Sequence, residues 1–559
     1  MKKIFNTTKK IAVTFAALST LLVSCNDDAL GEANHLFRPI ATATPTTSNM
    51  RALITVEWEN AVSGANSYGL ELYRDSLGPE DTQFTPVVTA TTTELKYTFG
   101  EKEELAWDSQ YYIRVKAIGD KESKFFVCKV ATTDDYPTHL KPISESIDVA
   151  AMVRWEPTTE KYTVLDITNS KDSVLMRFDI AKVTDSFKAT GLEANTTYRA
   201  KIYVGAMPEA PSAGKPFTAM PDNAYRGKKV FKTLASQVYD NMRDLTLLPD
   251  EEAEGMICTA FLDTVADNAT VLLKAGLTYT VDGATFNNKS IKFISKYSLE
   301  GFANIAIKAN FKLANDNNIE KLEFENLNIF TLGANENTAN YGGSYIFNIN
   351  TKSNVNTILL KGCNISFFRG VVRTQAGPVI NNFLIESCKI NRIGGYGIVT
   401  CDNADSKIRS ISMTKSTITY ADKAIASAKA EGCTDKVTVD QCTFCYSPVT
   451  DSKTSLFDFG SLTVQAKITN SIFGASRMAK DKGVCAWNGS KASQEVTGSY
   501  VTKDFEYAVN TETGAILKPF DSAMGKYGKN STDLFKDPEN LDFTIIDSKI
   551  GDAGDPRWK

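Results

Sequence analysis

Three side chains suited to binding an anionic sugar polymer recur at a constant spacing in the second half of the chain. Arg369, Tyr396 and Lys423 are 27 residues apart, and they open the similar stretches RGVVR, YGIVT and KAIAS. If each stretch is a strand in one coil of a stacked fold, the three form a ridge, because adjacent coils lie about 4.8 Å apart. Arginine and lysine bind carboxylate or sulfate, and tyrosine offers a flat face. The spacing therefore predicts a site for an acidic polysaccharide; the alternative is three unrelated turn residues.

The same region carries residues that a calcium-dependent polysaccharide lyase would need. Such an enzyme neutralises a uronate carboxylate with a cation, so that a base can remove the proton at C5. Arg369, Arg373 and Lys423 are the candidate bases. Carboxylate oxygens hold Ca²⁺, and the candidate ligands are Asp402, Asp405, Asp422 and Asp458. Their spacing matches no lyase motif, so binding without catalysis is the first hypothesis and the lyase is the alternative.

Two other kinds of function are disfavoured by composition. The only histidines, His35 and His139, precede this region, which removes mechanisms that need a histidine base there. The net charge of -4 and the pI of about 5.6 lack the basic footprint of a nucleic-acid-binding domain. We therefore expect no nucleic-acid partner.

The elements that must position these side chains are self-similar segments between residues 324 and 473. There are six of them, each six residues long: FENLNI, LKGCNI, IESCKI, MTKSTI, VDQCTF and ITNSIF. The fourth residue of each segment is, in order, Leu327, Cys363, Cys388, Ser416, Cys442 and Ser471. A repeat of this length is a supersecondary unit that cannot bury its apolar face alone. The alternation has period two and is rich in Ile, Val, Phe and Thr, which favours strands over helical repeats, and the dense leucine framework of a leucine-rich array is absent. The repeats predict a parallel β-helix with the small residues in one inward column.

The same column decides how the cysteines are interpreted. Nine of the ten cysteines follow Cys25, an odd number that would leave one thiol outside a disulfide framework. An inward column instead predicts free thiols packed as small hydrophobic groups. Cys442 and Cys445 form a C-x-x-C with no second pair and no histidine nearby, so a zinc site is not expected.

The N-terminus is typical of an export signal. Residues 1–24 combine four lysines with an apolar stretch from Ile11 to Val23, which is short for a membrane span. Leu22-Val23-Ser24-Cys25 resembles a bacterial lipobox, in which Cys25 is lipidated; the alternative is a secretory signal that happens to contain a cysteine. Asn26-Asp27-Asp28 resembles the surface-export signal of Bacteroidetes lipoproteins. The resemblance implies a tether over 25–36, anchored in the outer membrane and exposed at the cell surface.

Two segments before the repeats, 37–134 and 135–220, share one order of short strands. Each contains a tyrosine, Tyr111 or Tyr198, six residues after a leucine. This spacing resembles a tyrosine corner, in which the phenol bonds to the backbone at one end of a sandwich. Both segments resemble fibronectin type III domains and are interpreted as a stalk. Core packing, rather than sugar stacking, is expected for their matching tryptophans, Trp58 and Trp155.

The rest of the chain completes the predicted organisation. Residues 221–250 are expected to be a linker, and 251–559 a β-helix that opens with an amphipathic helix over 251–267. Residues 270–294 resemble the opening coil of the pectate-lyase-like superfamily.

The stretches FFRGVVRTQ, INRIGGYGIVTCDN and GDAGDPRW, with the lipobox and the two modules, resemble a Bacteroidetes family of surface lipoproteins of undefined function associated with polysaccharide utilisation. The predicted fold class is all-β: two fibronectin type III-like β-sandwiches followed by a right-handed parallel β-helix of the pectin-lyase type. The resemblance implies an outer-membrane glycan transporter as a partner.

Overall fold

The computed structural model describes residues 36–59, 64–74, 84–431, 433–448, 455–476 and 483–559. The chain divides into two compact units, Met1–Leu234 and Ala235–Lys559. None of the helices within these described ranges is long and apolar enough to cross a membrane. The expected leader, the lipidation site Cys25 and the tether up to residue 35 lie outside the described residues.

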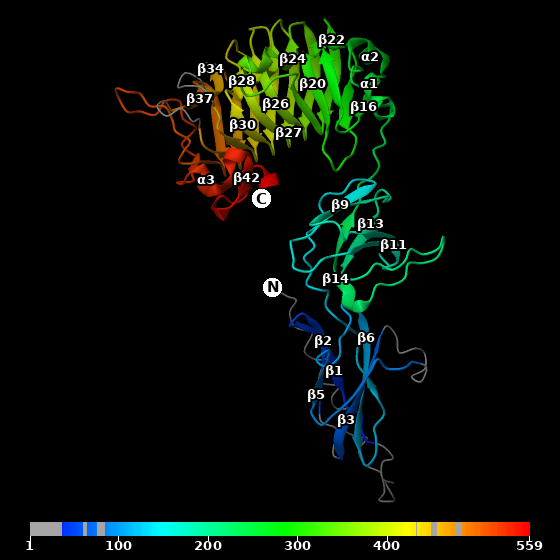
Figure 1. Cartoon of the computed structure of the whole chain (residues 1–559). Helices are drawn as coiled ribbons and strands as arrows, with labels where there is room; N and C mark the ends of the chain where they lie inside the picture. The colour runs from blue at the N-terminus through cyan, green and yellow to red at the C-terminus, as the bar shows by residue number, and fades with distance from the viewer. Residues whose placement is uncertain (1–35, 60–63, 75–83, 432, 449–454, 477–482) are drawn as a thin grey trace, which may run out of the picture. The chain divides into compact units, whose positions relative to one another are not determined.

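The first unit begins with a β-sandwich (Figure 1). One sheet is antiparallel and consists of β1 (Ala41–Ser48), β2 (Arg51–Trp58) and β5 (Lys96–Phe99). The other consists of β3 (Ala65–Arg74), β4 (Val88–Thr92), β6 (Gln110–Gly119), β7 (Phe126–Val127) and β8 (Ala131–Thr132). Alternate residues of β2 are buried and join residues of β3 and β6 in one apolar core. Trp58 belongs to this core, with 6% of its surface exposed.

The second sandwich ends later than the sequence predicts. Its sheets consist of β9 (Ala150–Arg154) with β12 (Ser186–Thr190), and of β10 (Val164–Thr168), β11 (Val174–Asp179), β13 (Thr197–Tyr203) and β14 (Tyr225–Lys232). β14 pairs antiparallel with β13, from Thr197 opposite Lys232 to Tyr203 opposite Tyr225. Eight of the thirty residues of the expected linker at 221–250 therefore form the last strand of this sandwich. Sequence reasoning missed this strand because its many basic residues resemble those of an exposed linker.

Both tyrosine corners are confirmed. The Tyr111 hydroxyl accepts a hydrogen bond from the backbone N–H of Ala106 at 2.9 Å, and the Tyr198 hydroxyl accepts one from Glu193 at 2.8 Å. Trp155 is 3% exposed and lies in the second core. The fibronectin type III-like architecture is thus present twice, and both tryptophans pack inside it.

The second unit is a parallel β-helix, as the repeats predict (Figure 1). Its first sheet has ten strands: β15 (Met242–Asp244), β16 (Ala269–Leu273), β19 (Ile291–Ser295), β22 (Asn317–Glu325), β25 (Ser353–Lys361), β27 (Val379–Glu386), β29 (Lys407–Thr414), β32 (Lys436–Asp440), β35 (Gln465–Thr469) and β38 (Ser493–Thr497). Strand β15 pairs parallel with β16, so this fold starts before residue 251.

The second sheet has fourteen strands. Its main path is β17 (Thr278–Asp282), β20 (Ala303–Ala309), β23 (Leu327–Thr331), β26 (Asn364–Thr374), β28 (Lys389–Cys401), β30 (Thr417–Ala421), β33 (Thr443–Cys445), β36 (Ile472–Phe473), β39 (Tyr500–Val501) and β40 (Gly525–Lys526). Four strands lie beside this path: β24 (Tyr345–Ile349), β31 (Ile425–Ala426), β34 (Ser455–Gly460) and β37 (Cys485–Gly489). A small two-stranded sheet pairs β18 (Thr285–Phe286) with β21 (Lys312–Leu313).

The predicted inward column of small residues is confirmed. Cys363, Cys388 and Cys442 are fully buried, and the backbone N–H of Cys388 donates to the Ser416 hydroxyl of the next coil at 3.0 Å. These three are free thiols, and eight of the nine cysteines among the described residues are buried. Burial raises the pKa of the Cys445 thiol to about 12, so this half of the C-x-x-C stays protonated and is unsuited to metal binding.

The N-terminal end of the β-helix is covered by two short helices. The single helix expected over 251–267 is instead two short ones, α1 (Asp250–Ala253) and α2 (Thr259–Thr264), separated around Gly255, and Phe261 of α2 is buried in the β-helix core.

The C-terminal elements α3 (Ser531–Leu534), β41 (Phe535–Asp537) and β42 (Asp542–Ile545) pack beside β33 and β36. The tail returns to β30, where Thr417 donates to buried Asp555 at 2.7 Å and accepts from the Trp558 indole at 2.7 Å.

Candidate functional site

A groove of about 370 Å³ lies on the second sheet of the β-helix, at β28, β31 and β34. Its polar lining comprises Tyr396, Thr400, Asp402, Lys423, Lys429 and Asp458. We call these residues, together with the two arginines that contact Tyr396, Arg369 and Arg373, the cationic groove. Four of the eight residues that the sequence singles out for binding, catalysis or metal ligation line the groove, and two more, Arg369 and Arg373, contact its tyrosine.

A bulge in β28 shapes this groove. Phe368 of β26 pairs with Ile393, and Gly370 pairs with Gly397, so β28 has two extra residues over the same interval. The extra length falls at Gly394-Gly395, directly before Tyr396. A bulge re-aims the side chains next to it, which explains why one tyrosine stands over the neighbouring strand.

Two glycines leave room for this arrangement. A Cβ added to Gly370 would lie 2.9 Å from the Tyr396 Cβ, and one added to Gly397 would lie 2.8 Å from the Lys423 Cβ. Gly397 also has a φ of +72°, a conformation that side chains disfavour. The close approach of successive coils at the groove therefore depends on glycine.

The Tyr396 ring contacts two guanidinium groups. The Arg369 Cζ lies 4.5 Å from the ring centroid and the Arg373 Cζ lies 4.4 Å from it. The Tyr345 ring meets it edge-on at 5.6 Å. Cation–π contacts of this kind hold planar groups in place, so the ring and both cations are fixed before any ligand arrives.

Arg373 is the one arginine of the groove with a carboxylate partner. Its Nε donates to Asp402 Oδ2 at 3.0 Å, and the Lys429 Nζ lies 3.7 Å from the other Asp402 oxygen. Burial works to lower the pKa of Arg373, but the hydrogen bond to Asp402 and nearby charges outweigh it and raise that pKa. An arginine held in its charged form is a poor base, which disfavours the catalytic role considered for it.

The predicted ridge forms at its first step and shifts by one residue at its second. Arg369 and Tyr396 stack as the 27-residue spacing predicts. Val399 pairs with Ile425, a step of 26, so Lys423 lies beside Gly397 rather than Tyr396. Lys423 nevertheless lines the groove. Within the described part of the chain, neither Arg369 nor Lys423 has a carboxylate at ion-pair distance.

Two of the four aspartates expected to bind calcium, Asp402 and Asp458, line the same groove, but the four do not form one cluster. Asp402 is paired with Arg373, Asp405 is exposed, and Asp458 accepts a 2.6 Å hydrogen bond from the Asn488 amide. Burial, and to a smaller extent the charge of Asp422, raises the pKa of Tyr341. Tyr341 lies outside the groove. No cluster of three or more acidic, histidine or cysteine ligands suited to a metal occurs among the described residues. Since Ca²⁺ takes six to eight oxygen ligands, these residues do not fit it.

A second column was not predicted. Phe367, Arg392, Tyr420 and Tyr446 all have positive φ angles, between 50° and 60°. The Arg392 Cζ lies 5.8 Å from the Phe367 ring and 5.0 Å from the Tyr420 ring, and Tyr420 stacks on Tyr446 at 4.9 Å. Each member follows the small inward residue of its coil by four positions, a signal visible in the sequence. Their faces cover one another, so this column stabilises the bend of each coil.

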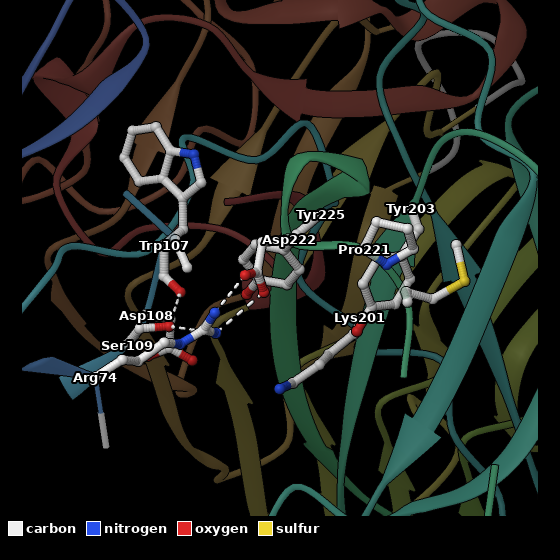
Figure 2. A pocket seen from close by; sticks show the side chains of 11 residues that line it. Arg74, Trp107, Asp108, Ser109, Lys201, Tyr203, Pro221, Asp222 and Tyr225 are labelled. Atoms are coloured by element: carbon white, nitrogen blue, oxygen red, sulfur yellow. Dashed lines mark hydrogen bonds and ion pairs between the residues drawn. The ribbon is translucent and has the colours of Figure 1, made fainter. Parts of the chain in front are cut away.

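A hollow of about 220 Å³ in the first unit, the sandwich pocket, has a different character (Figure 2). The Arg74 Nη2 donates to Asp222 at 3.0 Å and to the Ser109 hydroxyl at 3.3 Å. The other charged residues that line it also pair: Lys201 with Asp172 at 3.2 Å, and Asp108 with Lys228. Its charges therefore satisfy one another.

Comparisons with known proteins find similarity to parts of the chain but no activity. A family model described as "Domain of unknown function (DUF5123)" matches residues 437–558, the last coils and the C-terminal cap. No curated protein matches the chain.

Two chicken proteins with solved structures are similar to part of the chain. The CNTN1 FN1-FN3 domains share 16% identity over 36% of this chain and 68% of theirs, with a TM-score of 0.14. A two-domain fibronectin type III segment of tenascin shares 14% identity over 35% of this chain and all of its own, with a TM-score of 0.17. At such scores, the sandwich fold rests on the strand pairing and the tyrosine corners described above.

Proposed function

We propose that the β-helix binds an acidic polysaccharide in the cationic groove, without cleaving it. The observation that carries the proposal is the combination of Arg369 and Lys423, which have no carboxylate partner among the described residues, with Tyr396, whose ring is held in place by Arg369 and Arg373. Arginine and lysine gain charge-assisted hydrogen bonds when a ligand supplies carboxylate or sulfate. A tyrosine ring provides apolar contact for a sugar face.

The size and rigidity of the groove support the same function. Its volume of about 370 Å³ is at the small end of ligand sites, which suits a short stretch of a polymer that extends beyond it. The contacts of Tyr396 with both arginines fix the ring in advance, so binding loses little side-chain freedom. The lyase alternative has less support, because Arg373 is paired with Asp402 and the four aspartates do not form a calcium site.

The cellular setting of this proposal rests on the sequence. The lipobox at Leu22-Val23-Ser24-Cys25 supports lipidation at Cys25, and the acidic residues after it support export to the surface of the outer membrane. Two acyl chains or more give firm anchoring, at about 0.8 kcal/mol per buried methylene. The sandwiches then act as a spacer, and the bound glycan passes to an outer-membrane transporter during polysaccharide utilisation.

Affinity electrophoresis in gels containing polygalacturonate or chondroitin sulfate tests the binding. The chain should be retarded, and retardation should weaken as salt rises, because exposed charges are screened. The combined variant Arg369→Ala, Tyr396→Ala, Lys423→Ala should lose it, whereas Lys503→Ala, an exposed lysine outside the groove, should not. Equal retardation of both variants would reject the proposal. Calcium-dependent release of an unsaturated uronate, followed by its ultraviolet absorbance, would support the lyase instead.

A further inference from the structure

A second hollow, of about 410 Å³, lies on the first sheet of the β-helix, on β22, β25 and β27, with its edge on β29. Asparagine dominates its lining, and the polar side chains are Asn318, Glu320, Asn354, Asn356, Asn381 and Arg409. We call this surface the amide trough. It lies on the first sheet, whereas the cationic groove lies on the second, so its chemistry can be considered separately.

The amides of the trough are held in rows by hydrogen bonds between coils. Asn354 Nδ2 donates to Asn318 Oδ1 at 3.0 Å. In the parallel row, Asn356 donates to Glu320 at 2.5 Å and Asn381 donates to Asn356 Oδ1 at 3.2 Å. Strand register continues this row to Arg409, since Ile380 pairs with Ile408 and Asn382 with Ser410. The side chains are therefore ordered before any ligand is present, which lowers the entropic cost of binding.

These bonds leave much of the amide capacity unused. A primary amide has two N–H donors and an oxygen with two acceptor sites, and each bond along a row uses one donor and one acceptor site. Asn318, Asn354 and Asn381 are exposed, so the remaining groups face solvent. Successive amides repeat at the coil spacing of about 4.8 Å, comparable with the length of a sugar ring. Asparagine is otherwise disfavoured in strands, so its concentration here is unlike an ordinary strand surface.

Charge separates the trough from the groove. Glu320 accepts from Asn356, and Arg409 lies 3.4 Å from Asp435. The one acid and the one base that line the trough are thus both engaged, and they balance. Such a surface offers neither an attractive field for an anion nor an apolar patch for a hydrophobic partner. Its chemistry suits hydroxyl groups, which accept from amide N–H and donate to amide oxygen.

We propose that the amide trough is a second carbohydrate-binding surface, which binds a neutral, hydroxyl-rich glycan chain through its asparagine amides. This site is independent of the cationic groove. The chain then presents two faces on the same coils, one for acidic and one for neutral sugar. A branched polysaccharide that carries both kinds of sugar would engage both faces.

Affinity electrophoresis of the full chain in gels containing galactomannan, xyloglucan or dextran tests the inference. At least one of these neutral polymers should retard the protein. Retardation should persist from about 0.05 M to about 0.5 M NaCl, because screening does not affect uncharged ligands. The double variant Asn354→Ala, Asn381→Ala should weaken it about tenfold or more. Val379→Trp, which fills the trough without removing an amide, should weaken it as well.

A second asparagine row supplies the matched control. Asn364 Nδ2 donates to Asn328 Oδ1 at 2.8 Å on the other sheet, outside the trough. Asn328→Ala with Asn364→Ala removes equivalent amides and should leave neutral-glycan retardation unchanged. Failure of all three polymers to retard the wild-type chain, or equal loss in trough and control variants, would overturn the inference. Loss of neutral-glycan binding in Arg369→Ala would assign that binding to the groove and also overturn it.

Discussion

The sandwich pocket and the cationic groove are lined by similar side chains, but their charges are arranged differently. In the pocket, Arg74 and Lys201 face carboxylates of the same unit, and Asp108 is paired with Lys228. In the groove, Lys423 and Arg369 face none among the described residues, and only Arg373 is paired. Matched ion pairs contribute to the protein's own structure, whereas unmatched cations gain a partner only when a ligand brings one. Two hollow surfaces of similar composition thus differ in whether the protein itself pairs their charges.

The largest expected effect on stability is for a buried ion pair of the first unit, where the charges are paired. In the second sandwich, Arg177 forms two hydrogen bonds to Asp166, at 2.6 Å and 2.7 Å, with side-chain exposures of 3% and 1%. Asp166→Ala leaves a buried cation without a carboxylate partner, which should cost about 3–5 kcal/mol. Calorimetry should show the sandwich transition at a lower temperature and the β-helix transition unchanged.

Asp222→Ala is the control for that substitution. Its carboxylate also pairs with an arginine, but the side chain is 53% exposed, and exposed pairs contribute about 0–1 kcal/mol. If Asp166→Ala and Asp222→Ala lower the sandwich transition temperature equally, burial does not determine how much these ion pairs contribute to stability.

The groove depends instead on backbone geometry, which gives the second prediction. Gly397→Ala places a Cβ within 2.8 Å of Lys423 at a φ of +72°, and strain of this kind costs about 1–3 kcal/mol. The β-helix transition should fall accordingly in thermal denaturation. Gly395→Ala is the matched control, because its nearest contact would be 3.8 Å away. If the two variants unfold alike, the tight packing at Gly397 is not needed to shape the groove.

Sequence reasoning succeeded where a pattern repeats in every coil. The inward column of Cys and Ser follows from period-two alternation, and the structure places it as predicted. The tyrosine corners rest on a fixed spacing to a leucine and were found for the same reason. Repetition provides several independent observations of one physical rule, so a single irregular coil does not hide it.

The rest escaped prediction because it arises from departures from the repeat. The Gly394-Gly395 bulge adds two residues to β28, and the next coil lacks these two residues. A constant spacing of 27 residues therefore placed Lys423 one position away from where it lies. The calcium ligands failed because sequence distance does not show which partner a carboxylate takes: Asp402 turns to Arg373. Strand β14 was missed because a basic surface strand resembles a linker when its pairing partner is unknown.

The third prediction concerns Asp402, because its carboxylate competes with an anionic ligand for Arg373 and Lys429. Asp402→Asn should lower β-helix stability by about 1–2 kcal/mol, the cost of weakening a hydrogen-bonded ion pair. It should also release Arg373 and Lys429 toward a ligand, so affinity for polygalacturonate should rise several-fold in titration calorimetry. Weaker binding would show that the Asp402 carboxylate itself contacts the glycan.

The smallest stability effect is expected for Lys423, where the contrast between the two kinds of surface is sharpest. Its ammonium group has no ion-pair partner within the described residues, so Lys423→Met keeps the aliphatic stem and removes only the charge. Stability should change by no more than about 0.5 kcal/mol, as for most surface substitutions. Retention by polygalacturonate should nevertheless drop, and its dependence on salt should become shallower, because one fewer charge is screened. Lys503→Met, in the turn after β39, removes a charge of the same kind away from the groove and should change neither property. A marked loss of stability in Lys423→Met would mean that this lysine is already satisfied by the protein, and the groove would then belong with the sandwich pocket as a structural surface.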